Sequence, residues 1–329
     1  AMPMRMARQL CGDAVVIRGD MDLYSRYSQM VTEIIHEQAP VYEKASIDEH
    51  YLDLTGLERF FGTLKWSQEL KKRIVDHTGL PVTFGLSLNK TLSKIATGEA
   101  KPDGALYVPS GQVKPFLYPL SIRKIPMVGD KTYRLLRSMG ISRIKTLSQV
   151  PVEMLEHVLG KNGIALWKKA NGIDTAPVEP YSERKSLGSE RTFESDTTDV
   201  QAIHALLVSM VEKLAFQLRQ EQKLTSCVTV KIRYSNYDTH TLQRRIAYTA
   251  FDHHLIVTAR ELFRKLYTRR MLIRLLGVRF SHLVHGTQQL NMFEDTGELV
   301  HLYQHMDAIR KRYGSRAIGR AAGYRGRDH

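Results

Sequence analysis

Two acidic residues, Asp48 and Glu49, stand side by side in a stretch that otherwise alternates apolar and polar residues. Along a regular strand, neighbouring side chains face opposite sides, so the pair could not serve one site there. At a hairpin tip or a bulge the two carboxylates converge, and their mutual repulsion then requires a cation. Mg²⁺ takes one or two carboxylates plus phosphate oxygens, so the pair favours phosphoryl-transfer chemistry. A solvated turn without chemistry is the alternative for such a pair taken by itself.

The residues around the pair predict the elements that position it. A period-two pattern over 41–54 predicts two strands that turn around residues 48–50. The order of strands and helices over this region indicates an α+β domain. The other predicted elements are helices over 21–38, 65–77 and 89–100, a short strand over 81–87 and a turn over 101–104.

The rest of the chain predicts two further regions, with boundaries near residue 116 and near 177–183. Residues 116–175 show short helical pieces separated by glycines, which is typical of small helices joined by tight turns. From residue 184 the pattern predicts one sheet with helices. Its elements are strands over 186–193, 224–236, 240–251 and 272–285 and helices over 199–221 and 252–269, followed by a tail helix over 298–314.

Positive charge is unevenly distributed along the chain. The 329 residues carry 48 Lys and Arg against 34 Asp and Glu, a net charge of +14 with a pI of about 9.7. Residues 1–115 hold 14 residues of each sign, so the excess lies in 116–183 (+4) and 184–329 (+10). Such an excess indicates an acidic partner, with nucleic acid as the first hypothesis. Surface charge that merely aids solubility is the alternative.

Other features of the composition bound the class of protein. The two cysteines, Cys11 and Cys227, exclude a disulfide scaffold and indicate a reducing compartment. The N-terminus has no apolar core of signal-peptide length, and no stretch approaches the ~18 apolar residues of a membrane span. We therefore expect a cytoplasmic protein of two or three domains, without a membrane segment.

The acidic pair belongs to a longer pattern. The run from Ser46 to Glu49, followed by Tyr51 to Gly56, strongly resembles the catalytic strand pair of the Y-family translesion DNA polymerases. Further stretches match that family in the same order, so the resemblance covers nearly the whole chain. These are Met2-Pro3 with Ala7 and Cys11, Gly85-Leu86-Ser87, Asn89-Lys90, Lys94-Ile95-Ala96, Lys101-Pro102-Asp103-Gly104, Ser186, Glu190-Arg191-Thr192-Phe193 and Leu275-Leu276-Gly277-Val278.

The resemblance implies an α+β, multidomain Y-family architecture. Its parts are a partial palm over 1–115, a helical thumb with a helix-hairpin-helix over 116–178, a linker over 179–183, and a little finger over 184–286. The little finger would be a four-stranded sheet with two helices. Residues 287–329 would hold a clamp-binding peptide and a C-terminal helix and tail, whose last residues, including Arg320, we expect to be mobile.

The resemblance also implies the chemistry. The reaction would be template-directed transfer of a nucleotide from a dNTP to a primer 3′-hydroxyl on primer–template DNA. Asp48 and Glu49 would be two of three carboxylates that hold two Mg²⁺ ions. Lys101 would contact the incoming triphosphate, where a point charge needs no fixed geometry. Ser46 would support the strand rather than touch substrate.

One part of the family's pattern does not occur in this sequence. An Asp-bearing strand and a small fingers subdomain should precede Met2-Pro3. The run Asp20-Met21-Asp22 superficially copies that strand, but it follows Met2-Pro3 and opens a predicted helix, where acids stabilise by roughly 0.3–1 kcal/mol. We therefore reject it, and we expect this polypeptide alone not to extend a primer.

Two regions are predicted to hold DNA. Residues 125–132 begin a helix-hairpin-helix whose turn would present backbone N–H groups to a phosphate. The usual first glycine of that turn is Met127 here, which predicts a poorer turn. In the little finger, strand alternation would place several cations on one outward face. The predicted DNA contacts are Val128, Gly129, Lys131 and Thr132 in the thumb and Lys231, Arg233 and Arg245 in the little finger.

A short peptide after the last predicted strand resembles the motif by which bacterial polymerases bind the sliding clamp. It combines the polar Gln289 with three apolar residues, Leu290, Met292 and Phe293, that could fill a pocket on a partner.

Three functions remain open from the sequence. The first is a monomeric translesion DNA polymerase. The second is a non-catalytic DNA-binding protein of the same architecture. The third is a different Mg²⁺-dependent nucleotidyl transferase that needs no primer–template.

Overall fold

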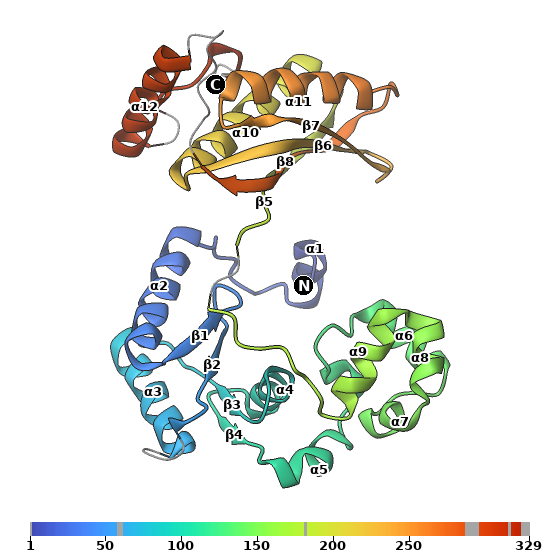
Figure 1. The fold of residues 1–329 in the computed structure, drawn as a ribbon. Helices are drawn as coiled ribbons and strands as arrows, with labels where there is room; N and C mark the ends of the chain where they lie inside the picture. The colour runs from blue at the N-terminus through green and yellow to red at the C-terminus, as the bar shows by residue number, and fades with distance from the viewer. Residues whose placement is uncertain (1, 58–61, 181–182, 287–295, 315–316, 324–329) are drawn as a thin grey trace. The chain divides into compact units, whose positions relative to one another are not determined.

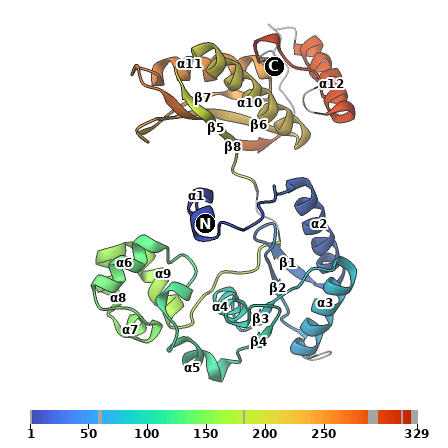
Figure 2. The ribbon, with the colours of Figure 1, turned by 180° about the vertical axis from the view of Figure 1, so that it is seen from behind.

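The computed structural model describes residues 2–57, 62–180, 183–286, 296–314 and 317–323 (Figures 1 and 2). The chain divides into two compact units, residues 1–182 and 183–329. Within the described ranges, no helix is both long enough and apolar enough to cross a bilayer.

A β-hairpin lies at the start of the first unit's folded core. Strands β1 (Val41–Lys44) and β2 (His50–Asp53) pair antiparallel, as the period-two pattern predicts. Helices α2 (Met21–Gln38) and α3 (Thr63–Thr78) bury Ile35 and Ile74 beside them. The Asp20 carboxylate accepts hydrogen bonds from two N–H groups at the start of α2. The prediction that Asp20 opens a helix is therefore confirmed.

A second, parallel strand pair holds α4. Strands β3 (Phe84–Leu86) and β4 (Ala105–Tyr107) pair in parallel and flank α4 (Lys90–Ala100) in the sequence. β3 is shorter than the predicted strand over 81–87. β4 was not predicted, because three residues give too little alternation to reveal a strand. A Cβ on Gly85 would lie 2.3 Å from the backbone oxygen of Ser93, so this glycine lets α4 pack directly on β3.

Short helices complete the first unit, as the glycine-punctuated pattern predicts. They share one apolar core with α4, in which Leu92 and Ile95 lie with Leu117, Ile122 and Leu136. The predicted boundary near residue 116 therefore lies inside this unit. These helices are α5 (Val113–Leu117), α6 (Asp130–Ser138), α7 (Ile144–Gln149), α8 (Val152–Leu159) and α9 (Lys161–Ala170). Helix α1 (Met4–Leu10) at the N-terminus was not predicted and buries none of its residues.

The second unit is a four-stranded antiparallel sheet with the order β5-β8-β6-β7. Both of its long helices pack on one face of the sheet and bury a large apolar core (Figure 1). This agrees with the predicted four strands and two helices. The elements are β5 (Ser186–Thr197), α10 (Val200–Gln220), β6 (Lys223–Tyr234), β7 (Thr239–Thr249), α11 (Asp252–Leu266) and β8 (Ile273–His285).

A network of buried charges attaches the C-terminal helix α12 (Thr296–Tyr313) to this unit. Arg219 pairs with Asp252 at 2.6 Å and with Asp307 of α12 at 2.7 Å. Glu212 is almost fully buried and accepts the Arg320 N–H at 3.1 Å. The expectation that Arg320 lies in a mobile tail is therefore wrong. A buried carboxylate needs donors, and the tail supplies one.

The turn before α6 forms around a non-glycine residue in the left-handed region. Met127 has φ +79° and an exposed side chain, and the Val128 N–H still donates to the Ile125 oxygen at 3.2 Å. The turn that we predicted to be poorer is therefore made, but with backbone strain at Met127. An L-residue with a Cβ costs roughly 1–2 kcal/mol in this conformation.

Replacing Met127 with glycine should stabilise the first unit by about 1 kcal/mol, because the strain is removed at a site that favours glycine. Urea unfolding followed by circular dichroism would measure the change. The matched control is Met127→Ala, which keeps a Cβ at the same φ and should give no such gain. Equal stabilities for the two variants would contradict the assignment of strain.

Candidate active site in the β1–β2 hairpin

Asp48 and Glu49 lie in the loop that joins β1 to β2, just before β2 begins. The N–H groups of Ala45 and Ser46 donate to the Glu49 carbonyl at 3.0 and 3.2 Å and close the loop. The backbone is therefore bent where the two acids stand, and strand alternation does not force them apart. The negative charge of Asp48 acts to raise the pKa of Glu49, so the two carboxylates are close enough to interact.

Asp48 is exposed and held in its charged form. The Ser46 hydroxyl donates to the Asp48 carboxylate at 2.6 Å and lowers its pKa below the ordinary value. The positive charges of Lys101 and Lys94 act in the same direction. Ser46 thus holds the Asp48 carboxylate in place.

Glu49 is half-buried and paired with a lysine. Partial burial acts to raise the pKa of Glu49, but the hydrogen bond from the Lys94 ammonium opposes it, and the pKa remains below the ordinary value. Lys94 contacts both oxygens of this carboxylate. Burial, and then the neighbouring Glu49, raises the pKa of the Tyr51 phenol, so Tyr51 stays protonated beside the acid. The loop therefore carries two ionised carboxylates.

Lys101, the residue predicted to contact the triphosphate, lies near the same loop. Lys101 follows the last residue of α4 and is close enough to Asp48 for its charge to lower that pKa. The structure thus groups Asp48, Glu49 and Lys101. Sequence reasoning quoted Lys94 as part of a motif but gave it no role. Its spacing of four residues from Lys90 was the available signal, because such residues share a helix face.

The predicted thumb contacts lie at one helix N-terminus. The N–H groups of Val128 and Gly129 donate to carbonyls inside the turn, at 3.2 Å each. Lys131 and Thr132 lie in the first turn of α6, where N–H groups have no partner within the helix. No side chain among the described residues caps this end. The N–H groups of Lys131 and Thr132 thus face outward, whereas those of the other two are engaged.

The predicted little-finger contacts lie on the sheet face opposite the helices. Lys231 and Arg233 alternate with Val230 and Ile232, which are fully buried under α10 and α11. Lys231 pairs with Glu190 at 3.0 Å, and Arg233 donates to Thr239 at 2.9 Å. These two cations are therefore partly engaged within the sheet.

The neighbours Arg244 and Arg245 take opposite faces of β7. Arg245 is exposed, whereas Arg244 lies toward the helices and pairs with Glu261 of α11. Arg279 on β8 is also exposed and pairs in register with Thr229, on the same face as Lys231. Sequence analysis could not assign a contact to Arg279, because the sheet face on which it lies depends on the pairing register.

Several remaining candidates lie elsewhere. Gln289, Leu290, Met292 and Phe293 fall outside the described residues. Across the part of the chain that the structure describes, no group of three or more His, Cys, Asp or Glu side chains could hold a metal ion. The acidic loop therefore offers two carboxylate ligands.

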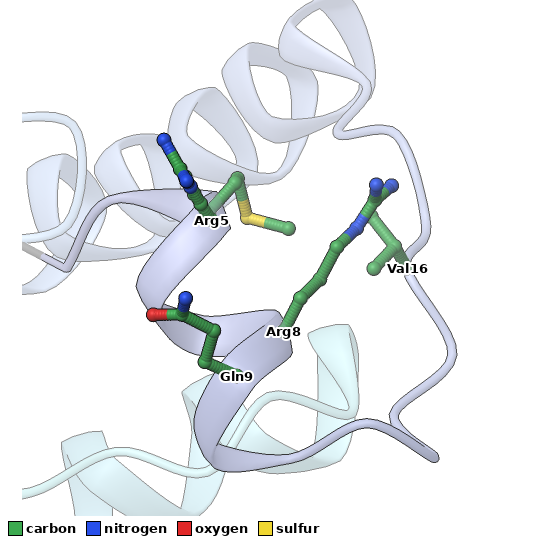
Figure 3. Close-up of a pocket in the computed structure, with 5 residues that line it drawn as sticks. Arg5, Arg8, Gln9 and Val16 are labelled. Atoms are coloured by element: carbon green, nitrogen blue, oxygen red, sulfur yellow. The ribbon is translucent and has the colours of Figure 1, made fainter.

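An open pocket of about 550 Å³ lies by the N-terminal helix, apart from the acidic loop. Arg5, Arg8 and Gln9 of α1 line it together with Val16, and the Arg8 side chain reaches toward Val16 (Figure 3). None of the acidic-loop residues lines this pocket. Its arginines are exposed and lack an acidic or aromatic neighbour in the lining, so it adds nothing to the site.

Comparison with known proteins identifies the family. Residues 1–98 match the model of the impB/mucB/samB family, and residues 184–292 match the C-terminal domain of that family. A DNA polymerase IV of Dehalococcoides mccartyi is 34% identical over 99% of this chain and 85% of its own length. A DNA polymerase IV of Desulfatibacillum aliphaticivorans is 32% identical over 98% of this chain and 83% of its own length. The chain belongs to the Y family of translesion DNA polymerases.

Solved Y-family structures share the fold. A Y-family polymerase chimera of Dbh and Dpo4 aligns with a TM-score of 0.74 and 25% identity, over 87% of this chain and 83% of that one. The insertion ternary complex of Dbh DNA polymerase aligns with a TM-score of 0.61 and the same identity and coverage. These likenesses confirm both the resemblance in the sequence and the predicted Y-family fold class. Members of this family use divalent metal ions.

Proposed function

We propose that Asp48 and Glu49 are two of the metal-binding carboxylates with which the intact Y-family polymerase performs template-directed nucleotidyl transfer. The observation that supports this most directly is the bent loop, which brings two ionised carboxylates together beside Lys94 and Lys101. A solvated turn would need neither the hydroxyl of Ser46 nor the ammonium of Lys94 on these acids.

The residues of the loop fit Mg²⁺. Both donors are carboxylates, the hard oxygen ligands that Mg²⁺ prefers, and both are charged at neutral pH. A cation, the Lys94 ammonium, already binds one of them. When bound, two Mg²⁺ ions would activate the primer 3′-hydroxyl and neutralise the departing pyrophosphate.

The chain's own side chains orient the substrates around this loop. Ser46 fixes the Asp48 carboxylate by donating to one of its oxygens. Lys101 is exposed and adjacent to Asp48, so it can meet the negative triphosphate of a dNTP as a mobile point charge. We assign it to nucleotide binding, as the sequence predicts.

Primer–template DNA would be held by two surfaces of this chain. In the thumb, the free N–H groups of Lys131 and Thr132 and the Lys131 ammonium suit a phosphate, whereas Val128 and Gly129 shape the turn. In the little finger, the helix-free face presents Lys231, Arg233 and Arg245. Neither surface reads bases, so binding would be independent of sequence.

We further propose that the polymerase works as a monomer in the cytoplasm and is tethered to the sliding clamp. Gln289, Leu290, Met292 and Phe293 form the clamp-binding peptide of this proposal, which rests on the sequence. Cys11 and Cys227 are both free thiols, as a reducing compartment requires.

In the intact polymerase, Asp48→Ala or Glu49→Ala should lower primer extension at least about a thousandfold, because a charge that acts in the transition state is removed. DNA affinity, measured by fluorescence anisotropy, should stay nearly unchanged. Asp76→Ala, at an exposed acid of α3, is the matched control and should extend normally. Undiminished extension by either loop variant would overturn the metal assignment, and inactivity of the wild-type polymerase would favour a purely DNA-binding role.

Arg245→Ala should weaken DNA binding and lower the slope of log affinity against log salt concentration by about 0.9, the value for one lost phosphate contact. Its neighbour Arg244 provides the control, because Arg244→Ala removes an equal charge from the helix-covered face. Titrations at several salt concentrations would compare the two variants. Identical slopes for both would exclude the helix-free face as the DNA surface.

Replacing Leu290, Met292 and Phe293 together with alanine should spare extension on short templates and abolish stimulation by the clamp, since the apolar anchors are lost. Surface plasmon resonance with immobilised clamp measures the binding directly. Leu302→Ala, at an exposed leucine of α12, is the control. Clamp binding that survives the triple replacement would reduce this peptide to a linker.

A further inference from the structure

Helix α4 docks the catalytic hairpin through two lysines that are one helical turn apart. Lys90 pairs with Glu43 of β1 at 2.7 Å, and Lys94 pairs with Glu49 of the loop. Residues four apart share a helix face, so the two lysines meet the hairpin side by side. Asn89-Lys90 and Lys94-Ile95-Ala96 carry part of the family resemblance, yet the proposed mechanism gives neither lysine a task.

The Lys90 pair is the more enclosed of the two. The side chains of Lys90 and Glu43 are 19% and 22% exposed, against 42% and 34% for Lys94 and Glu49. The same Glu43 oxygen that binds Lys90 also accepts the N–H of Glu179 at 2.9 Å. The Lys90 ammonium further lies 5.5 Å from the centre of the Tyr51 ring. Several contacts therefore hold this pair in one geometry.

Neighbouring contacts fix the surroundings of this pair. Tyr51 stands directly opposite Glu43 in the hairpin register, so Lys90 touches both strands. The Asn89 amide donates to the Gly172 carbonyl at 2.9 Å, and the Thr91 hydroxyl donates to Asp174 at 2.6 Å. The segment that follows α9 is thus bound along the start of α4. Loss of Lys90 would loosen the hairpin at its centre.

The Lys94 pair has the opposite character. It is more exposed than the Lys90 pair, and ion pairs open to solvent contribute little, typically 0–1 kcal/mol. Lys94 binds both oxygens of Glu49, the atoms that a metal ion would need. One ammonium offsets a single negative charge, whereas the loop carries two, from Asp48 and Glu49. A divalent cation can offset both and can therefore displace the lysine.

We propose that the two lysines have opposed effects on the metal site: Lys90 positions the hairpin that presents the carboxylates, and Lys94 is an exchangeable counterion that leaves Glu49 when a divalent cation binds. This inference rests on the proposed function, in which Asp48 and Glu49 are metal ligands. It predicts that removing the two charges changes metal affinity in opposite directions. Two lysines with a shared structural role would change it in the same direction.

The test is Mn²⁺ binding to the full chain without DNA, followed by electron paramagnetic resonance of the free ion. Lys94→Met should tighten binding about two- to fivefold, because the competitor is removed. Lys90→Met should weaken binding about tenfold, the loss typical of residues that orient metal ligands. Lys90→Arg and Lys94→Arg keep the charges and should return binding toward the wild-type value.

Controls separate folding from positioning. Lys65→Met removes an equally charged, exposed lysine on α3 and should leave Mn²⁺ binding unchanged. Circular dichroism would verify each fold, and Glu43→Gln, which breaks the same pair from the hairpin side, replaces Lys90→Met if that variant does not fold. Unchanged or weaker binding by Lys94→Met, or unchanged binding when the Lys90–Glu43 pair is broken, would overturn the inference.

Glu49→Gln distinguishes this inference from the proposed function. If Glu49→Gln lowers Mn²⁺ binding while Lys94→Met leaves it unchanged, the metal site stands and the exchange role of Lys94 fails. If Glu49→Gln binds Mn²⁺ as the wild type does, or if the wild type binds none, the metal assignment fails, and the roles of both lysines fail with it.

Discussion

The repulsion between two adjacent carboxylates is the constraint on which the first unit depends. Asp48 and Glu49 can face one site because the chain bends there, and the Ser46 hydroxyl on Asp48 and the Lys94 ammonium on Glu49 favour the charged forms of both. The bend is made by backbone hydrogen bonds within the loop. The neighbouring cations are Lys94 of α4 and Lys101, which follows α4. The position of α4 against the hairpin therefore sets the positive charge around the two acids.

The side of α4 that faces away from the hairpin holds the helix in position by packing into the apolar core. At about 100° per residue, Lys90 and Lys94 lie about 40° apart around the helix, whereas Leu92, Ile95 and Ala96 lie on the opposite side. The apolar side enters the core that continues into the thumb. One helix therefore joins the acidic loop to the body that carries the turn around Met127, and a change in this core would reach both.

Much of the fold could be predicted from the sequence, because its longer elements have clear periods. Helices such as α2 and α10 and the hairpin around Asp48 follow from apolar spacing alone. β4 could not be predicted, since its three residues become a strand only by pairing with β3. Arg320 was misassigned because the buried Glu212 that binds it is more than a hundred residues away. Such partners are set by tertiary structure and leave no local pattern.

The candidate site shows the same division between local and tertiary information. Asp48 and Glu49 are neighbours in one motif and can be read directly, whereas Lys101 was predicted only through the family resemblance; the structure brings its charge near Asp48. The sheet face on which a cation lies is harder to predict from the sequence. Arg244 and Arg245 are adjacent in the sequence, yet of the two only Arg245 lies on the open side of the sheet. A net charge counted from the sequence likewise does not show which cations are paired with acids. Over residues 184–329, Arg219 and Arg310 neutralise buried acids and Lys231 is paired with Glu190, so these cations add nothing to the excess of +10. The excess is carried by the cations whose acidic partners are missing from the same face, and these cations set the field that the surface presents.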